Sequence, residues 1–148
     1  MKGYHNSNQD NLKAIDSNIG IYGGIFVTLN SSHCTDTHYG EYVYAIDFET
    51  ICESSDIEDF LYTEEGCQFL ADNNRTEDDV EALRDCEYAI DDDDTYRENQ
   101  KIRALIAKKL GFDAVEENDG YLVVNGVVTY LGHCKSEEVA EYIENDYD

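Results

Sequence analysis

A histidine followed by two small polar residues is the first place in this sequence where chemistry could occur. His5 stands at the end of the first predicted strand, and Asn6 and Ser7 follow it directly. An imidazole can donate or accept a hydrogen bond and changes its charge near neutral pH. Because a lone histidine is more often a hydrogen-bonded structural residue than a functional one, His5 alone does not indicate a site.

Carboxylates beside a predicted turn form a second candidate group. Glu116, Glu117 and Asp119 flank or occupy the turn expected at residues 118–120. In so acidic a chain, carboxylates at a turn are normally solvated, so their type says little. Their position says more, because a carboxylate at a strand end can be held rigidly and directed into a cleft.

Histidine and cysteine occur close together at His33, Cys34 and His38, and again at His133 and Cys134. Such a pair could form a thiol nucleophile or part of a metal site. Neither stretch has a third supporting group, so we favour surface loops. The cysteines of the chain form no C-x-x-C pair and are irregularly spaced, which favours reduced thiols and predicts neither a disulfide framework nor a metal site.

Two charged segments each have a plain and a functional interpretation. Residues 91–94 are four consecutive aspartates, but the EF-hand spacing is missing, which favours a solvated loop or helix end over calcium binding. Five of the ten basic residues lie between positions 97 and 109. We interpret them as a solvated helix face, with Lys108 and Lys109 complementing the helix C-terminus, in preference to a phosphate-binding face.

The apolar pattern of the first half predicts strands and then helices that could position these residues. Strands are predicted at residues 1–5, 21–29 and 42–48. Residues 57–70 carry an apolar stripe typical of a helix, interrupted by Gly66. Thr76 is typical of a helix N-cap, and Val80 and Leu83 are expected to face inward from the helix that follows.

The second half predicts a helix followed by a small β unit. Residues 97–110 have apolar positions at helical spacing, and Gly111 is typical of the residue that ends a helix. Strands are predicted at residues 112–116, 121–124 and 127–131. Asn125-Gly126 predicts a type I′ hairpin that pairs the last two of these strands.

A short amphipathic helix is predicted at residues 136–147, with Ser136 as its N-cap and Val139, Ala140 and Ile143 facing inward. Because strands precede and follow the helices, the pattern predicts the α+β class. The length of 148 residues suits a single domain, residues 1–148, with an acidic helical insertion around residues 57–98.

The composition excludes several classes of protein. The chain has 34 acidic and 10 basic residues, a formal net charge of −24. Phosphates would be repelled, which excludes direct nucleic-acid binding, whereas basic protein surfaces, including those that normally hold DNA, would attract the chain. No apolar run approaches the roughly 20 residues of a membrane span. Repulsion between such acidic copies favours a soluble monomer, and the cysteine usage favours the cytoplasm.

The order of several short segments resembles that of the ADP-ribosyltransferases. Their N-terminal half has a strand bearing H-x-[ST], then a glycine and an aromatic strand, then a short helix ending in tyrosine. Here the matching segments are Tyr4-His5-Asn6-Ser7, Gly24-Ile25-Phe26-Val27-Thr28 and Tyr39-Gly40-Glu41-Tyr42-Val43-Tyr44. The C-terminal half of the family pattern resembles the segment Leu110-Gly111-Phe112-Asp113-Ala114-Val115 of this chain, together with the acidic residues and apolar strands that follow it. Within that family, the sequence resembles the phage-encoded anti-CRISPR members that act on type I-F surveillance complexes.

The resemblance implies two β-sheets, mixed and antiparallel, split around a central NAD cleft, and NAD as the substrate. It implies that His5 hydrogen-bonds the ribose of the nicotinamide half. Ser7 and the neighbouring backbone, including Asn6, would fix the amide. Phe26 or Tyr39 would supply the aromatic face for the nicotinamide ring.

The resemblance also implies a carboxylate that steadies the cationic sugar or orients the acceptor as the glycosidic bond breaks. We expect Asp119 first, because the Asn-Asp pair before an apolar strand matches the phage pattern, and Glu117 second. The implied function is mono-ADP-ribosylation of a host protein, the PAM-recognising part of a CRISPR surveillance complex, in the host cytoplasm. The alternative is a non-enzymatic DNA mimic, in which the acidic surface alone blocks a nucleic-acid site.

Overall fold

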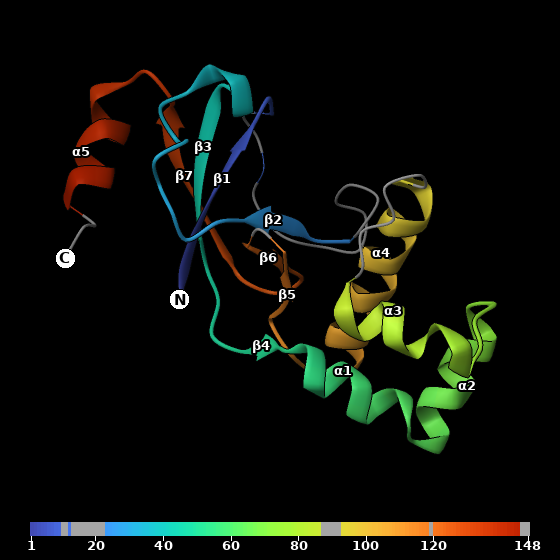
Figure 1. Cartoon of the computed structure of the whole chain (residues 1–148). Helices are drawn as coiled ribbons and strands as arrows, with labels where there is room; N and C mark the ends of the chain where they lie inside the picture. Colours follow the sequence, from blue (N-terminus) through green and yellow to red (C-terminus); the bar gives the residue numbers. More distant parts are fainter. Residues whose placement is uncertain (10–11, 13–22, 87–92, 119, 146–148) are drawn as a thin grey trace.

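In its described residues, the computed structural model has two β-sheets, four α-helices on one side and a fifth α-helix at the opposite end (Figure 1). The structure describes residues 1–9, 12, 23–86, 93–118 and 120–145. The strands and helices confirm the α+β class and the split into an antiparallel and a mixed sheet. None of the described helices is both long and apolar enough to cross a membrane.

The first sheet has three antiparallel strands in the order β1-β3-β7. These strands are β1 (Lys2–Ser7), β3 (Tyr42–Asp47) and β7 (Val127–His133). In the register of β1 and β3, His5 lies opposite Tyr44. Strand β3 is almost entirely buried, because β1 and β7 pair with it on both edges and its side chains pack on both faces.

The second sheet has four strands in the order β2-β6-β5-β4. These strands are β2 (Ile25–Val27), β6 (Gly120–Val123), β5 (Ala114–Glu117) and β4 (Ile51–Cys52), and only β4 and β5 run parallel. The two sheets meet where Tyr4 of β1 and Thr28, just after β2, exchange backbone hydrogen bonds of 2.9 and 3.2 Å. Gly3 lies so close to Val27 that a Cβ atom there would be 2.4 Å from a Val27 methyl group.

Five helices accompany the sheets in the described part of the chain. They are α1 (Ser54–Leu61), α2 (Glu64–Asp72), α3 (Val80–Asp85), α4 (Asp93–Lys109) and α5 (Glu137–Asn145). Helices α1 to α4 lie together beside the second sheet, whereas α5 packs against β7 at the other end of the molecule (Figure 1). The predicted helix end at Gly111 is confirmed, with φ +83°, and the predicted cap at Thr76 accepts a hydrogen bond from the Asp78 amide.

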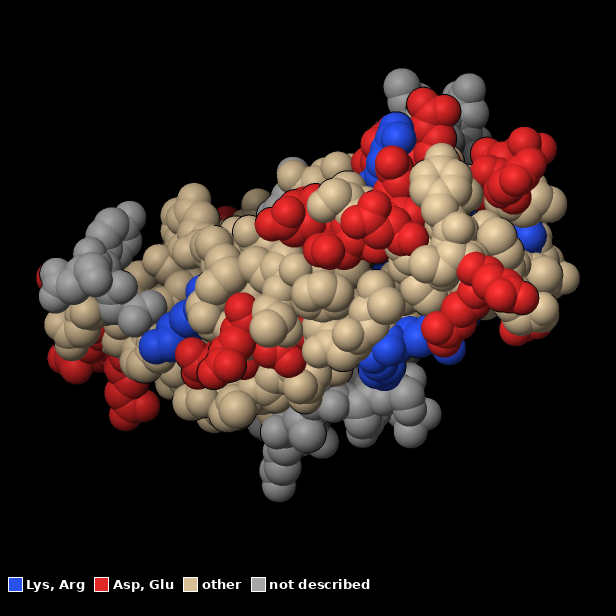
Figure 2. Space-filling model, turned by 90° about the horizontal axis from the view of Figure 1, so that it is seen from below, with Lys and Arg blue, Asp and Glu red and all other residues tan. Residues whose placement is uncertain are grey.

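Acidic side chains occupy much of the surface shown in Figure 2, which views the molecule from below Figure 1. Lysine and arginine side chains occupy smaller areas of the same face. An ion pair across two helices joins Lys109 Nζ of α4 to Glu65 Oε1 of α2 at 3.2 Å. Acidic side chains therefore outnumber basic ones on this face, as they do in the whole sequence, whose formal charge is −24.

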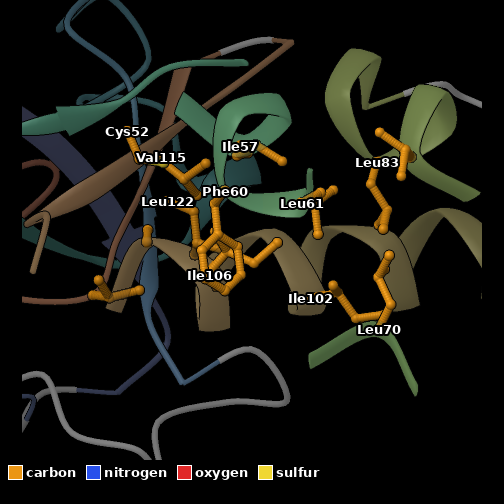
Figure 3. Packing of buried hydrophobic residues seen from close by; sticks show 14 residues of the cluster. Cys52, Ile57, Phe60, Leu61, Leu70, Leu83, Ile102, Ile106, Val115 and Leu122 are labelled. Atoms are coloured by element: carbon orange, nitrogen blue, oxygen red, sulfur yellow. The ribbon is translucent and has the colours of Figure 1, made fainter. Parts of the chain in front are cut away.

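The largest apolar cluster lies between the helices and the second sheet (Figure 3). Ile106 of α4 is fully buried with Val115 of β5 and Leu122 of β6. Ile57 and Phe60 of α1 cover the same cluster. This packing fixes α4 and the end of β5 relative to each other.

The predicted helix over residues 57–70 is in fact two helices, and the break is not at Gly66. Helix α1 ends at Leu61, and Thr63 caps α2 by accepting a hydrogen bond from the Gly66 amide at 2.9 Å. Gly66 lies within α2, where an added Cβ atom would be 1.9 Å from the Phe60 carbonyl oxygen. The glycine therefore permits the close approach of the two helices rather than interrupting one.

The predicted hairpin at Asn125-Gly126 is wrong. Strands β6 and β7 belong to different sheets, and β7 pairs with β3 instead of returning along β6. Asn125 connects the two sheets by donating its backbone and side-chain N–H groups to Asp113, at 3.0 and 2.9 Å. Tertiary pairing of β7 with β3 thus overrides the local turn signal.

Two predicted burial patterns also need correction. Of the five basic residues of α4, four are exposed as expected, but Arg103 is only 1% exposed. In α5, Val139 is buried and Ile143 is partly buried as predicted, whereas Ala140 is exposed and Tyr142 packs inward. Arg103 is buried because it has hydrogen-bond acceptors there, which are described below.

Candidate functional site

A cavity of about 460 Å³ lies where the two sheets meet. Its walls come from β1 and β2, the loop that leads to β3, helix α4 and the turn between β5 and β6. The residues predicted from the sequence that line it are His5, Asn6, Phe26, Tyr39 and Glu117. Residues from both ends of the chain are therefore brought together around one space.

His5 is fixed by the strand beside it. Its Nδ1 atom lies 2.7 Å from the Phe26 carbonyl oxygen, and because a carbonyl oxygen only accepts, Nδ1 is the donor. Burial lowers the pKa of His5; the hydrogen bond to Phe26 opposes this effect, and the nearby His33 adds to it. A neutral imidazole that donates through Nδ1 keeps Nε2 as an acceptor, which suits a ligand hydroxyl group.

Asn6 and Ser7 differ in their relation to the cavity. The Asn6 amide nitrogen donates to the carbonyl oxygens of Cys34 and Gly40 at 3.3 and 3.2 Å, which holds the loop before β3 against β1. Its Oδ1 atom is buried without a hydrogen-bond partner among the described residues. Ser7 is not among the cavity-lining residues, and its Oγ accepts a hydrogen bond from the Gln9 amide at 3.1 Å.

The two predicted aromatic residues both line the cavity but have different surroundings. Phe26 is partly buried and packs against the helical core, so it has a structural role as well. Tyr39 is 57% exposed and meets the rings of His33 and His38 edge-on, with centroids 5.4 and 5.3 Å away. Tyr39 thus has free ring surface that a planar ligand could cover.

Glu117 is the described carboxylate of the predicted pair. Its side chain is 3% exposed, and Cys86 Sγ donates a hydrogen bond of 2.8 Å to its Oε2. Burial raises the pKa of Glu117, against the opposing effects of Cys86 and Arg103. Asp119 lies outside the described residues, although Asn118 and Gly120 on either side of it line the cavity.

Several cavity residues were not predicted from the sequence. His33 was interpreted as part of a surface loop, but it is half-buried and lines the cavity, where burial lowers its pKa. Tyr96 and Gln100 reach the cavity from α4, and Tyr96 Oη accepts a hydrogen bond from Asn118 at 3.1 Å. Their spacing of four residues places them on one helix face, which was the available signal. Within the described ranges, no three His, Cys, Asp or Glu side chains gather as metal ligands do.

Comparison with known proteins adds two findings. A family model described as "Anti-CRISPR Type I-F ADP-ribosyltransferase AcrIF11" matches residues 68–130, which include α4, β5 and β6. A solved structure described as "Crystal structure of an anti-CRISPR protein" has a TM-score of 0.66 and 22% sequence identity. The match covers 88% of this chain and 94% of that one, which shows a shared fold. No curated protein matches the chain.

The segment matched by the family model carries the carboxylate side of the cavity, with Glu117 and Asn118. Both findings agree with the resemblance that the motif order implied. The chain is therefore similar over residues 68–130 to the anti-CRISPR type I-F ADP-ribosyltransferase family, and it shares its fold with a solved anti-CRISPR protein.

Proposed function

We propose that the chain is a mono-ADP-ribosyltransferase that uses NAD to modify a host protein. The observation that carries this proposal is the meeting of His5 and Glu117 in one cavity of about 460 Å³ between the two sheets. A neutral hydrogen-bonding imidazole, an exposed aromatic ring and a buried carboxylate are groups that can orient NAD and stabilise a developing positive charge. The family match over residues 68–130 supports the same reaction class.

The reaction breaks the bond between the sugar carbon C1′ and the nicotinamide nitrogen. The bonding electron pair leaves with nicotinamide, and a nucleophilic atom of the target protein forms the new bond to C1′ and gives up its proton. In this proposal His5 holds the ribose through Nε2, and Tyr39 or Phe26 covers the nicotinamide ring. The carboxylate of Asp119 or Glu117 stabilises the positive charge that develops on the sugar.

The target that fits this chain best is a protein surface that normally holds DNA. Such a surface is basic, and the acidic face in Figure 2, with a formal charge of −24 on the whole chain, would be attracted to it. We therefore propose the PAM-recognising part of a type I CRISPR surveillance complex as the target. The chain would act on it as a monomer in the host cytoplasm, without contacting nucleic acid itself.

Mass spectrometry of the purified surveillance complex, after incubation with NAD and this chain, tests the proposal. We expect one subunit to gain the mass of an ADP-ribosyl group at a substoichiometric amount of the chain. The His5→Ala variant should lose the modification, whereas His133→Ala, at an exposed position that does not line the cavity, should retain it. Inhibition of the complex with every subunit mass unchanged contradicts the proposal.

The acidic surface supports a second candidate, a DNA mimic that blocks the complex without chemistry. The net charge of −24 and the acidic face of Figure 2 favour it. A mimic requires one copy per target, ignores NAD and tolerates His5→Ala. Titration of the complex with the chain in the presence and absence of NAD separates the two candidates.

A further inference from the structure

Behind the cavity wall lies a buried charged group that the proposed reaction has not used. Arg103 of α4 is 1% exposed and carries a full positive charge in the interior of an acidic protein. A buried charge is costly unless it is paired and hydrogen-bonded, so its retention at this place needs a reason. Its surroundings indicate what the charge does.

Arg103 joins two separate elements through backbone carbonyl groups. Its Nη1 donates to the carbonyl oxygens of Leu83 and Arg84 at 2.6 and 2.9 Å, at the end of α3. Its Nη2 donates to the carbonyl oxygen of Glu116 at 2.6 Å, on β5. The guanidinium group is therefore held at fixed points on both sides, directly before Glu117 in the chain.

The Nε donor of Arg103 faces the carboxylate of Glu117. Arg103 Nε lies 3.6 Å from Glu117 Oε1, and neither atom has a hydrogen-bond partner in the described part of the chain. The other oxygen, Oε2, accepts the hydrogen bond from Cys86 Sγ. Cys86 follows α3 in a left-handed conformation, with φ 49°, and burial raises the pKa of its thiol to about 12, so it remains a donor.

We propose that Arg103 and Cys86 clamp Glu117, one on each carboxylate oxygen, and so position it in the wall of the cavity. The clamp acts on the carboxylate and not on substrate, which makes Arg103 and Cys86 positioning residues. Its relevance to NAD rests on the proposed function. The other groups near Glu117 are Gln100 and Tyr96. The hydrogen bond from Gln100 opposes the rise in the Glu117 pKa that burial causes. The pKa of Tyr96 is raised mainly by burial, with further contributions from Cys86 and Glu117.

Titration of the Glu117 carboxyl carbon by ¹³C NMR tests the clamp without any activity. The resonance is assigned by its absence from the spectrum of Glu117→Gln. In Arg103→Gln, we expect the pKa of Glu117 to rise by about one pH unit or more, because an opposite charge close by lowers a carboxyl pKa by roughly 1–3. Arg103→Lys should raise the pKa of Glu117 less than Arg103→Gln does. Arg97→Gln, at an exposed position of the same helix, should leave the pKa of Glu117 unchanged.

Two further measurements keep the proposal testable if the Arg103 variants unfold. In the unaltered chain, the Nε–H resonance of Arg103 should shift with the same midpoint as the Glu117 carboxyl carbon. Cys86→Ala should raise the pKa of Glu117, whereas Cys67→Ala, at an exposed thiol, should not. Independent midpoints for Arg103 and Glu117, or a Glu117 pKa unmoved by Arg103→Gln and Cys86→Ala, overturns the clamp.

The outcomes separate the clamp from the proposed function. Calorimetric titration with NAD reports on the function, since a chain that binds no NAD cannot be the transferase even when Arg103 and Glu117 titrate together. If the chain binds NAD but Arg103 and Glu117 titrate with different midpoints, the clamp is contradicted and the proposed function is not. If both hold, nicotinamide release by Arg103→Gln should require a higher pH than release by the unaltered chain, while the KM for NAD stays within about twofold. A lower kcat with an unmoved pH profile contradicts the positioning role.

Discussion

At the scale of single residues, the cavity combines a base and an acid that burial affects in opposite directions. Burial lowers the pKa of His5 and raises the pKa of Glu117, so both effects favour the neutral forms. Cys86 and Arg103 oppose the effect of burial in part at Glu117, and the hydrogen bond to the Phe26 carbonyl opposes it in part at His5. Titratable groups perturbed in this way are typical of functional sites.

The lowered pKa of His5 predicts an acid-sensitive stability. Below the unfolded value of 6.5, the unfolded chain binds a proton at this histidine more readily than the folded chain does. The free energy of unfolding should therefore decrease as the pH falls from 6.5 towards the lower folded pKa. Urea denaturation at several pH values checks this, with His5→Asn as the comparison.

In His5→Asn, the contribution of this histidine to the pH dependence should disappear. His33 has a lowered pKa as well, so a smaller slope should remain in the variant. A His5→Asn curve parallel to that of the unaltered chain between pH 5 and pH 7 contradicts the prediction.

At the scale of elements, the sequence was informative where local patterns and tertiary packing agree. The strand at Tyr42–Asp47 and the cap at Thr76 follow from apolar runs and local hydrogen bonds, and both are present. Asn125-Gly126 was misleading, because the competing partner of β7 is β3, which lies far away in the sequence. A pattern read over a few residues cannot contain that pairing.

The site was predictable only in part for the same reason. His5 and Glu117 come from motifs that can be recognised, but their meeting depends on how the two sheets are joined. Arg103 shares its helix with four exposed basic residues, and the charge pattern does not distinguish it from them. Its burial depends on carbonyl groups of α3 and β5 that only the folded chain brings near.

The contact between α1 and α2 predicts an unusual result for a glycine in a helix. Gly66→Ala should destabilise the fold by about 1–3 kcal/mol, because the new methyl group would meet the Phe60 carbonyl and force the backbone apart. Helix propensity alone predicts the opposite, a gain of up to about 1 kcal/mol. The urea midpoint of the variant measures which effect is larger.

Ala71→Gly provides a control in the same helix. Ala71 is exposed, so its replacement by glycine should cost about 1 kcal/mol through propensity alone. A Gly66→Ala protein more stable than the unaltered chain would show that α1 and α2 do not approach as described.

At the scale of the whole molecule, the dominant feature is the unbalanced charge. The formal charge of −24 is spread over a small surface of 8667 Å², so acidic groups repel one another in the folded state. Repulsion of this kind extends over the Debye length, about 30 Å at 0.01 M salt and about 10 Å at 0.1 M. Repulsion between acidic groups therefore destabilises the folded state by an amount that depends on the ionic strength of the solvent.

Added salt should accordingly raise the Tm of the chain. We expect scanning calorimetry to show an increase of several degrees between low salt and physiological ionic strength, because screening weakens the repulsion. NaCl and KCl should act alike, since the effect depends on ionic strength rather than on a particular cation. A Tm that is constant or falls over this range would mean that self-repulsion does not limit stability.

The cysteines described above give the chain a built-in position for a reporter group. Cys34, Cys52, Cys86 and Cys134 are buried, whereas Cys67 is exposed on α2, away from the β1 side of the molecule (Figure 1). An accessible thiol reacts with maleimide reagents far faster than thiols enclosed by packing. A dye attached at Cys67 would therefore report on contact between helices α1 to α4 and a partner protein. No cysteine has to be added to the chain for this labelling.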